Sequence, residues 1–446
     1  AGGPGTGKTT TVARIVALLC EQAARSGGRM PLIALAAPTG KAAARLEEAV
    51  HAEAVRLDVA ETIRGQLLAL QGSTLHRLLG RRPGSNSRFR HDRNQRLPHD
   101  VVIVDETSMV SLSLMARLLE ALRPQARLVL VGDPAQLASI EAGAVLGDIV
   151  GPAAERMVMG AAARRSLETA SGATVDAVEP ERGATIGDGI VVLDRGHRFG
   201  GGIAALASSV RAGDADAALA LLHDPPDDVV WIPADVGSDS IDALSVVKAG
   251  AVSAGAAVFE AAVAGDGLAA LGALGSFRIL CAHRRGAYGV SMWTARVEGW
   301  LETELDGFST ADPWYVGRPL LVNENDYELR LYNGDTGVII RSAGEADRVN
   351  AAFERRGELV RYSPSRLSAI DTVYAMTIHK SQGSQFDTAA VLLPDPGSRL
   401  LSRELLYTAV TRARTRLIVA GSEESIRLAV ERPVARASGL RQRLWG

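Results

Sequence analysis

The feature that most constrains this chain is a glycine-rich run near its start, Gly2-Gly-Pro-Gly-Thr-Gly-Lys-Thr9, which fits G-x-x-x-x-G-K-[ST]. In such a loop, glycines let backbone N–H groups turn inward around phosphates, the lysine reaches the β- and γ-phosphate oxygens, and the last hydroxyl ligates Mg²⁺. The following residues, Thr10 to Cys20, are expected to form a helix whose N-terminal dipole favours an anion. The residues expected to hold ATP are Gly2, Gly3, Pro4, Gly5, Thr6, Gly7, Lys8, Thr9 and Thr10.

Lysine usage supports this interpretation. Four lysines stand against 45 arginines, and three of the four lie in segments with functional character: Lys8, Lys41 and Lys380. An ammonium is a compact point charge, whereas a guanidinium is a planar fork. The pattern indicates that lysine is kept where a point charge must fit among phosphates, although chance placement is the alternative.

Two further motifs follow expected strands. The apolar run Val101–Val104 predicts a buried strand that delivers Asp105 and Glu106 at its carboxyl end, where open α/β sheets place their ligands. We expect Asp105 to hold Mg²⁺ and Glu106 to polarise the attacking water. An acidic pair that caps the next helix is the alternative. After the next strand, Gln136 of Gly132-Asp-Pro-Ala-Gln136 is placed to sense the γ-phosphate.

Composition excludes several classes of protein. A formal net charge of −2 excludes a globally basic binder but allows a local basic track. Two distant cysteines and scattered histidines offer neither a disulfide framework nor zinc-type spacing, which indicates a reduced, cytoplasmic protein. No apolar run reaches ~18 residues, so no membrane span is expected. Because a phosphate loop normally follows a buried strand, we expect a fragment that lacks its N-terminal region.

The chain is expected to be an α/β protein of several parts. Residues 1–150 alternate strands and helices, with an arginine-rich insertion at about 80–99 that contacts nucleic acid or is a solvated loop. Residues 151–190 are expected to be a linker or insertion, and 191–446 a second α/β unit with a small β module at about 335–370. Strands of the second unit are expected at Val229–Ile232, Arg278–Cys281, Pro319–Val322, Ala389–Leu393 and Leu417–Ala420.

Later motifs add basic and hydroxyl side chains. Arg198 and Arg412 are candidates to neutralise charge on the γ-phosphate, although each alone is commonly a surface arginine. The segment Thr377-Ile-His-Lys-Ser-Gln-Gly383 mixes hydroxyls, an imidazole and an ammonium. That mixture suits contact with phosphodiesters and is poor core material.

Together the motifs resemble those of superfamily 1 DNA helicases of the 5′→3′ branch. More narrowly, Gln136–Asp148, Arg284–Ser291, Asn325–Tyr327 and Asn333–Asp335 resemble the RecD family, the alpha subunits of exodeoxyribonuclease V. The helicase motifs are, in order, Gly2–Thr9, Ala37–Lys41, Thr74–Arg77, Asp105-Glu106, Gly132–Gln136, Arg198, Thr377–Gly383 and Tyr407–Arg412.

The resemblance implies two RecA-like P-loop NTPase domains, 1A and 2A, with the 80–99 segment as a 1B-type insertion and the 335–370 module as an SH3-like 2B insertion. It also implies ATP and Mg²⁺ as cofactors, single-stranded and duplex-end DNA as partners, and a heterotrimer with RecB- and RecC-type subunits. Phosphate contacts would give little sequence preference. The residues expected to contact DNA are Pro38, Thr39, Lys41, His76, Thr377, His379 and Lys380.

Three functions stay open from the sequence. The chain could be the motor subunit of a recombination helicase–nuclease, a stand-alone 5′→3′ helicase of the same kind, or a DNA-dependent ATPase that does not unwind. We expect no nuclease site in this chain, because Lys248, the one lysine outside the motifs, has only Asp239 and Asp242 near it in sequence.

Overall fold

The computed structural model describes residues 1–81, 88–138, 144–180, 185–194, 201–237, 241–326, 328–342, 345–355, 357–434 and 439–446. The chain forms two compact units, Ala1–Arg198 with Ala435–Gly446, and Phe199–Val434. The first unit therefore extends past residue 150 and takes in the whole of segment 151–190, which we expected to be a linker or insertion.

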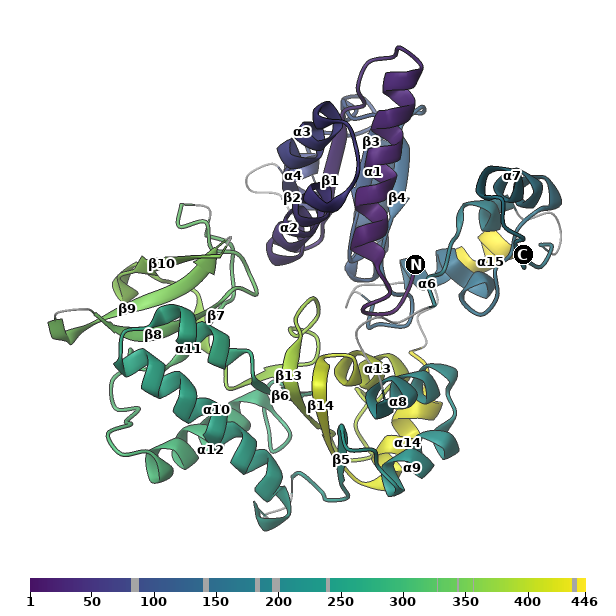
Figure 1. Ribbon diagram of the computed structural model, residues 1–446. Coiled ribbons are helices and arrows are strands. Elements are labelled where there is room, and N and C mark those ends of the chain that lie inside the picture. The colour runs from purple at the N-terminus through teal and green to yellow at the C-terminus, as the bar shows by residue number, and fades with distance from the viewer. Residues whose placement is uncertain are drawn as a thin grey trace. The chain divides into compact units, whose positions relative to one another are not determined.

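A parallel sheet of strand order β2-β1-β3-β4 is the centre of the first unit (Figure 1). Two short segments continue it: the N–H of Gly2 donates to the carbonyl of Gly132 at 3.0 Å, and the N–H of Leu193 donates to the carbonyl of Ala1 at 2.8 Å. The phosphate loop thus starts at the carboxyl end of the sheet. The strands are β1 Ile33–Ala37, β2 Gly72–Thr74, β3 Val101–Val104 and β4 Arg127–Leu130.

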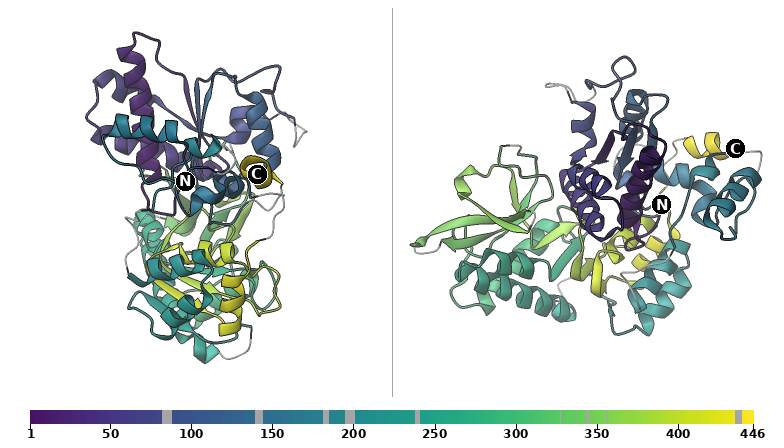
Figure 2. Two further views of the ribbon diagram at one scale, coloured as in Figure 1. Left: turned by 90° about the vertical axis from the view of Figure 1, so that its right-hand side faces the viewer. Right: turned by 45° about the horizontal axis from the view of Figure 1, so that its top comes forward.

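Helices cover both faces of this sheet (Figure 2). One face packs on α1 (Lys8–Arg25), α2 (Gly40–Arg56) and α3 (Glu61–Ala69). The other packs on α4 (Leu75–Leu79) and α5 (Leu112–Ala121). Helix α1 buries Val12, Val16 and Cys20 at a four-residue spacing, which places their side chains on one stripe toward the sheet.

The remainder of the first unit packs beside the sheet through α6 (Val145–Val150) and α15 (Leu440–Trp445). The indole Nε1 of Trp445 donates to the carbonyl oxygens of Asp148 and Ile149, both at 3.2 Å. A Cβ at Gly151 would lie 2.2 Å from that indole nitrogen, so only glycine fits there. The short helices η2 (Gly151–Ala154) and η4 (Thr185–Gly189) and the helix α7 (Ala161–Ser171) lie in the 151–190 segment.

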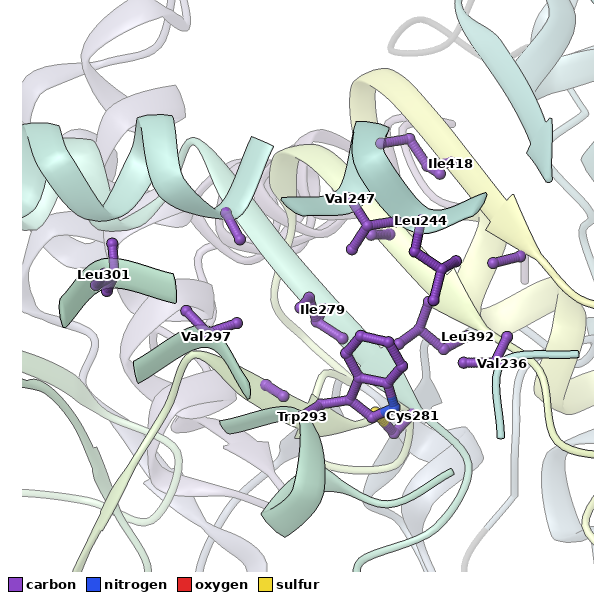
Figure 3. Close-up of a cluster of buried hydrophobic side chains, with 14 of the residues drawn as sticks. Val236, Leu244, Val247, Ile279, Cys281, Trp293, Val297, Leu301, Leu392 and Ile418 are labelled. Atoms are coloured by element: carbon purple, nitrogen blue, oxygen red, sulfur yellow. The ribbon is translucent and has the colours of Figure 1, made fainter. Parts of the chain in front are cut away.

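The second unit contains a second parallel sheet, of strand order β12-β6-β13-β14-β5. One face packs on α10 (Ser245–Val263) and α12 (Val290–Glu304), and Figure 3 shows the Trp293 indole of α12 among Ile279, Cys281 and Leu392. The strands are β5 Val229–Ile232, β6 Phe277–Cys281, β12 Ala375–Thr377, β13 Phe386–Leu392 and β14 Ala413–Ala420. The other helices of this unit are α8 Gly201–Ala212, α9 Ala215–His223, η5 Ile241–Leu244, α11 Gly267–Leu274, α13 Arg403–Val410 and α14 Glu423–Glu431.

An antiparallel sheet of strand order β10-β9-β8-β7-β11 is inserted into the second unit. Its first strand, β7 (Pro319–Val322), has the bounds that we predicted for a strand of the second unit, and it belongs to the antiparallel sheet rather than to the parallel one. A four-residue apolar strand has the same sequence pattern in either sheet, so its pairing partners decide. The other strands are β8 Thr336–Ser342, β9 Glu345–Arg355, β10 Glu358–Tyr362 and β11 Ile370–Thr372, with the short helix η6 at Pro364–Arg366.

The α/β prediction is confirmed, and the module is larger than the 335–370 segment that we expected. Among the described residues, α10 is the one helix with the length and composition to cross a membrane. It packs against α11, α12, β6 and β8, as a core helix of the second unit does. The Nζ of Lys248 on this helix forms an ion pair with Oε1 of Glu304 at 2.7 Å.

Candidate nucleotide and nucleic-acid site

The phosphate loop encloses its own lysine. The Nζ of Lys8 donates to the carbonyl oxygens of Gly2 and Gly3, both at 2.8 Å. Gly7 has φ of 83° and directly precedes α1, a backbone conformation that a side chain would strain. The result is a closed turn at the N-terminus of an 18-residue helix, with an ammonium already held inside it.

The acidic pair follows β3 directly. The backbone N–H of Glu106 donates to Oδ1 of Asp105 at 2.8 Å, and Glu106 adopts a left-handed φ of 50°. Burial, together with the neighbouring charge of Glu106, raises the pKa of Asp105 to about 6, while the Lys8 ammonium acts in the opposite direction. Both residues are half-buried at the carboxyl end of β3.

Gln136 lies in the turn after β4 and is buried. Its Nε2 donates to Oδ2 of Asp133 at 3.0 Å, while its Oε1 is buried with no hydrogen-bond partner. A buried acceptor without a donor is costly, so the carboxamide oxygen is suited to accept from a group that arrives with the nucleotide. Asp133, which orients the amide, was not among the residues that we predicted, although it lies within the same motif.

The expected DNA contacts of the first unit stand at the same edge of the sheet. Pro38, Thr39 and Lys41 follow β1, and His76 follows β2; in parallel strands these carboxyl ends share one edge. Thr39 Oγ1 accepts from the N–H of Ala42 at 3.2 Å and so caps α2. The His76 ring lies 6.0 Å from the Phe89 ring, centre to centre.

In the second unit, Thr377 ends β12, and His379 and Lys380 lie in the turn that follows. Thr377 Oγ1 accepts from the N–H of Lys380 at 3.2 Å. Lys380 Nζ donates to Oδ1 of Asn323 at 2.6 Å and lies 3.6 Å from Oδ2 of Asp371. A cleft of about 820 Å³ adjoins these residues, and among those that line it are Arg284, Arg285, Ser291, Asp371, Thr377 and Lys380.

The structure describes one of the two arginines that we expect to neutralise charge on the γ-phosphate. Arg412 is buried, and its guanidinium donates to the carbonyls of Thr408 (2.9 Å) and Ser384 (3.1 Å) and to the hydroxyl of Thr411 (3.1 Å). These bonds orient the side chain within the second unit. Arg198 lies outside the described residues.

A family model described as an AAA domain matches residues 1–142, and one described as a UvrD-like helicase C-terminal domain matches residues 372–420. The chain is 52% identical to the RecBCD enzyme subunit RecD of Mycolicibacterium smegmatis, over 99% of this chain and 71% of that protein. The chain belongs to the RecD family.

Other relatives are more distant. The chain is 34% identical to the RecBCD enzyme subunit RecD of Haemophilus influenzae, over 98% of this chain and 69% of that protein. It is 29% identical to the ATP-dependent RecD2 DNA helicase of Deinococcus radiodurans, over 99% of this chain and 49% of that protein. The chain also matches the structure of the Pif1 helicase from Candida albicans, with 15% identity and a TM-score of 0.46. This match covers 99% of this chain and 93% of the Pif1 chain.

Family membership confirms the helicase resemblance. The parallel sheets of this RecD-family chain are those of two RecA-like domains, and the chain is an ATP-dependent DNA helicase, a hydrolase that uses ATP. The roles of individual residues stay predictions.

In the arginine-rich segment of this RecD-family chain, two of the arginines contact other parts of the protein. Arg96 donates to the carbonyl of Leu122 at 2.6 Å, and Arg93 forms a 3.2 Å ion pair with Glu120. These two guanidinium groups thus bind the protein itself, while Arg82 lies outside the described residues. Contact of this segment with nucleic acid stays a prediction.

Sequence reasoning missed the residues that hold the predicted ones in place. Asn323 and Asp371 hold Lys380 from 57 and 9 positions away, and Ser384 holds Arg412 from 28 positions away. No local pattern signals the Asn323 and Ser384 contacts, because they depend on pairing between strands that are distant in sequence. Asp133 could have been found, since it stands three residues before Gln136 in a recognised motif.

Proposed function

We propose that this RecD-family chain is the motor subunit of a RecBCD-type helicase–nuclease, which moves 5′→3′ along DNA in double-strand break repair and recombination. The observation that supports it best is the single carboxyl edge of the first sheet. That edge carries the phosphate loop, the Asp105-Glu106 pair, Gln136 and the residues after β1 and β2. Nucleotide chemistry and strand contact would therefore share one rigid edge.

The nucleotide is ATP, held by residues 2–10, with the Lys8 ammonium on the β- and γ-phosphates. Thr9 and Asp105 would hold Mg²⁺; the turn puts a hydroxyl and a buried carboxylate at the same edge as Lys8, a donor set that suits this ion. When bound, Mg²⁺ neutralises charge on the phosphates. Glu106 would accept a proton from the attacking water, and the unpaired Oε1 of Gln136 would accept a hydrogen bond from that water.

Arg198 and Arg412 would neutralise charge on the transferring phosphoryl group. The strand would be held through its phosphates by Pro38, Thr39, Lys41 and His76 of the first unit and by Thr377, His379 and Lys380 of the second. The antiparallel module, as an SH3-like domain, would cover the strand.

The partners follow from the relatives. The most similar of those reported are named as RecBCD enzyme subunits, so the chain would work in a heterotrimer with RecB- and RecC-type subunits on single-stranded and duplex-end DNA in the cytoplasm. DNA degradation would come from a partner chain. Among the described residues no group of three or more His, Cys, Asp or Glu side chains could hold a metal ion, and the lack of a nuclease here stays a prediction.

The test uses the protein purified as its complete gene product. It should unwind a duplex with a 5′ tail, fail on the same duplex with a 3′ tail, and hydrolyse ATP faster when single-stranded DNA is added. Lys8→Ala should abolish unwinding, because a positioned cation at the transferring phosphoryl group contributes several kcal/mol, about a 10²–10³-fold rate. DNA-stimulated hydrolysis with no unwinding of either substrate, alone or after co-expression with the two partner subunits, would contradict the proposal.

A further inference from the structure

We propose that Asn323 is a positioning residue for strand binding, and that Asp371 is a built-in competitor of the strand, both acting through the ammonium of Lys380. The inference rests on the proposed function, in which Lys380 contacts a phosphodiester. It adds that the antiparallel module sets how available this ammonium is.

The two contacts come from the strands by which the chain enters and leaves the module. Asn323 follows β7 directly, and Asp371 lies in β11, which pairs antiparallel with β7. The N–H of Asn323 donates to the carbonyl of Ala369 at 2.8 Å, which fixes the backbone beside β11. Lys380 is therefore bound to the entrance and the exit of the module at once.

The two partners differ chemically. An ammonium only donates, so the atom of Asn323 that faces it must be the amide oxygen, at 2.6 Å. This neutral acceptor fixes the end of a flexible four-carbon side chain and leaves its charge intact. The contact with the Asp371 carboxylate is longer, with 3.6 Å between Lys380 Nζ and Oδ2, and the Asp371 side chain is 54% exposed. It offsets the positive charge, but solvent weakens the contact.

The contacts of Asn323 and Asp371 matter for strand binding because the Lys380 ammonium lies at a cleft. Lys380 and Asp371 both line the 820 Å³ cleft, together with Arg284 and Arg285. A phosphate that enters would meet an ammonium already ordered by Asn323, so less side-chain entropy is lost on binding. The same phosphate would have to displace Asp371. Removing the two partners should therefore change strand affinity in opposite directions, which a merely structural role would not do.

The experiment measures binding of a labelled oligothymidylate of about 20 nucleotides to the complete protein as a function of salt. Asn323→Ala should raise the Kd about three- to tenfold with an unchanged salt slope, since no charge is lost. Asp371→Asn should lower the Kd about two- to threefold at low salt, with the difference vanishing at high salt. Lys380→Ala should flatten the salt slope by about 0.7, the loss of one phosphate contact. Adding Asn323→Ala to Lys380→Ala should change nothing further.

Two matched controls isolate the effect. Asn350→Ala removes an amide of the same antiparallel sheet, which donates to Ser342 at 3.0 Å, and Asp387→Asn removes an exposed carboxylate at the opposite end of the parallel sheet. If Asn350→Ala weakens binding as much as Asn323→Ala, or if Asp371→Asn weakens binding, the inference is overturned. If Asn323→Ala has no effect while Lys380→Ala weakens binding, the inference fails and the proposed function stands. If Lys380→Ala has no effect, the strand contact itself is wrong.

Discussion

Asp100 and Asp105 stand at the two ends of strand β3, and their pKa values are shifted in opposite directions. Asp100 accepts from the N–H of Leu32 (2.8 Å), from Arg123 (2.7 Å) and from Arg29 (2.7 Å), contacts that lower its pKa. Burial and Glu106 raise that of Asp105 to about 6. One end of the strand stabilises the fold through its carboxylate, while the other holds a carboxylate that the fold disfavours.

Asp100→Asn should destabilise the chain by about 1–2 kcal/mol at pH 7, because a charge-assisted acceptor of three donors is lost. A lowered folded pKa means that the unfolded chain binds the proton first as pH falls. The wild-type advantage should therefore be complete at neutral pH and shrink below about pH 4. Urea midpoints of the two proteins across this range check it, with Asp58→Asn, an exposed position of the same unit, as the control.

Asp105→Asn should change the stability of the chain in the opposite direction to Asp100→Asn. A raised folded pKa means that ionisation costs folding energy, so the amide should stabilise the nucleotide-free chain by about 1–3 kcal/mol above pH 6. The gain should fade as pH falls toward 4, where the folded carboxyl is protonated in any case. Urea unfolding and ATP hydrolysis are measured together. Loss of stability at pH 7.5 would show that Asp105 is a structural residue rather than a functional one.

Glu106→Gln should bind ATP with nearly wild-type affinity and hydrolyse it about 10²–10⁴-fold more slowly, because the amide cannot accept the proton of the attacking water. The left-handed backbone at this position is unchanged by the substitution, so the fold should be kept. Equilibrium binding of a fluorescent ATP analogue and single-turnover hydrolysis give the two numbers, with Glu61→Gln as the control. Wild-type turnover in Glu106→Gln would remove this carboxylate from the mechanism.

Arg412→Ala should reduce hydrolysis by two orders of magnitude or more and change ATP affinity less. It should also lower stability, because two carbonyls and a hydroxyl lose a buried donor, at about 1–3 kcal/mol for each unsatisfied group. Arg416→Ala, at an exposed position of β14, is the matched control. If DNA binding disappears while hydrolysis persists, the roles assigned to Arg412 and to the Thr377–Gly383 segment are exchanged.

Lys41→Ala should weaken binding of single strands of any base composition equally and flatten the salt dependence by about 0.7, as the loss of one phosphate contact requires. Lys248→Ala is the control, since it removes the same charge from an ion pair with Glu304. Fluorescence anisotropy on poly-pyrimidine and mixed-sequence strands measures both. A strong dependence on base identity would contradict a translocating motor.

The sequence by itself determined the local structure of the candidate nucleotide-binding edge. The phosphate loop, the start of α1 and the acidic pair each depend on residues a few positions apart. Gly7, for example, takes a positive φ, and α1 begins directly after it. The strand before Asp105 is equally local, because four β-branched residues in a row are suited to burial on both faces.

Only the tertiary structure decided which sheet β7 joins, that α15 returns to the first unit, and that Lys380 is held by Asn323 and Asp371. The physical reason is the same in each case. A short apolar strand, a terminal helix and an ammonium each accept several partners of equal chemistry. The choice among those partners is made by chain closure over tens or hundreds of residues, which no local spacing records.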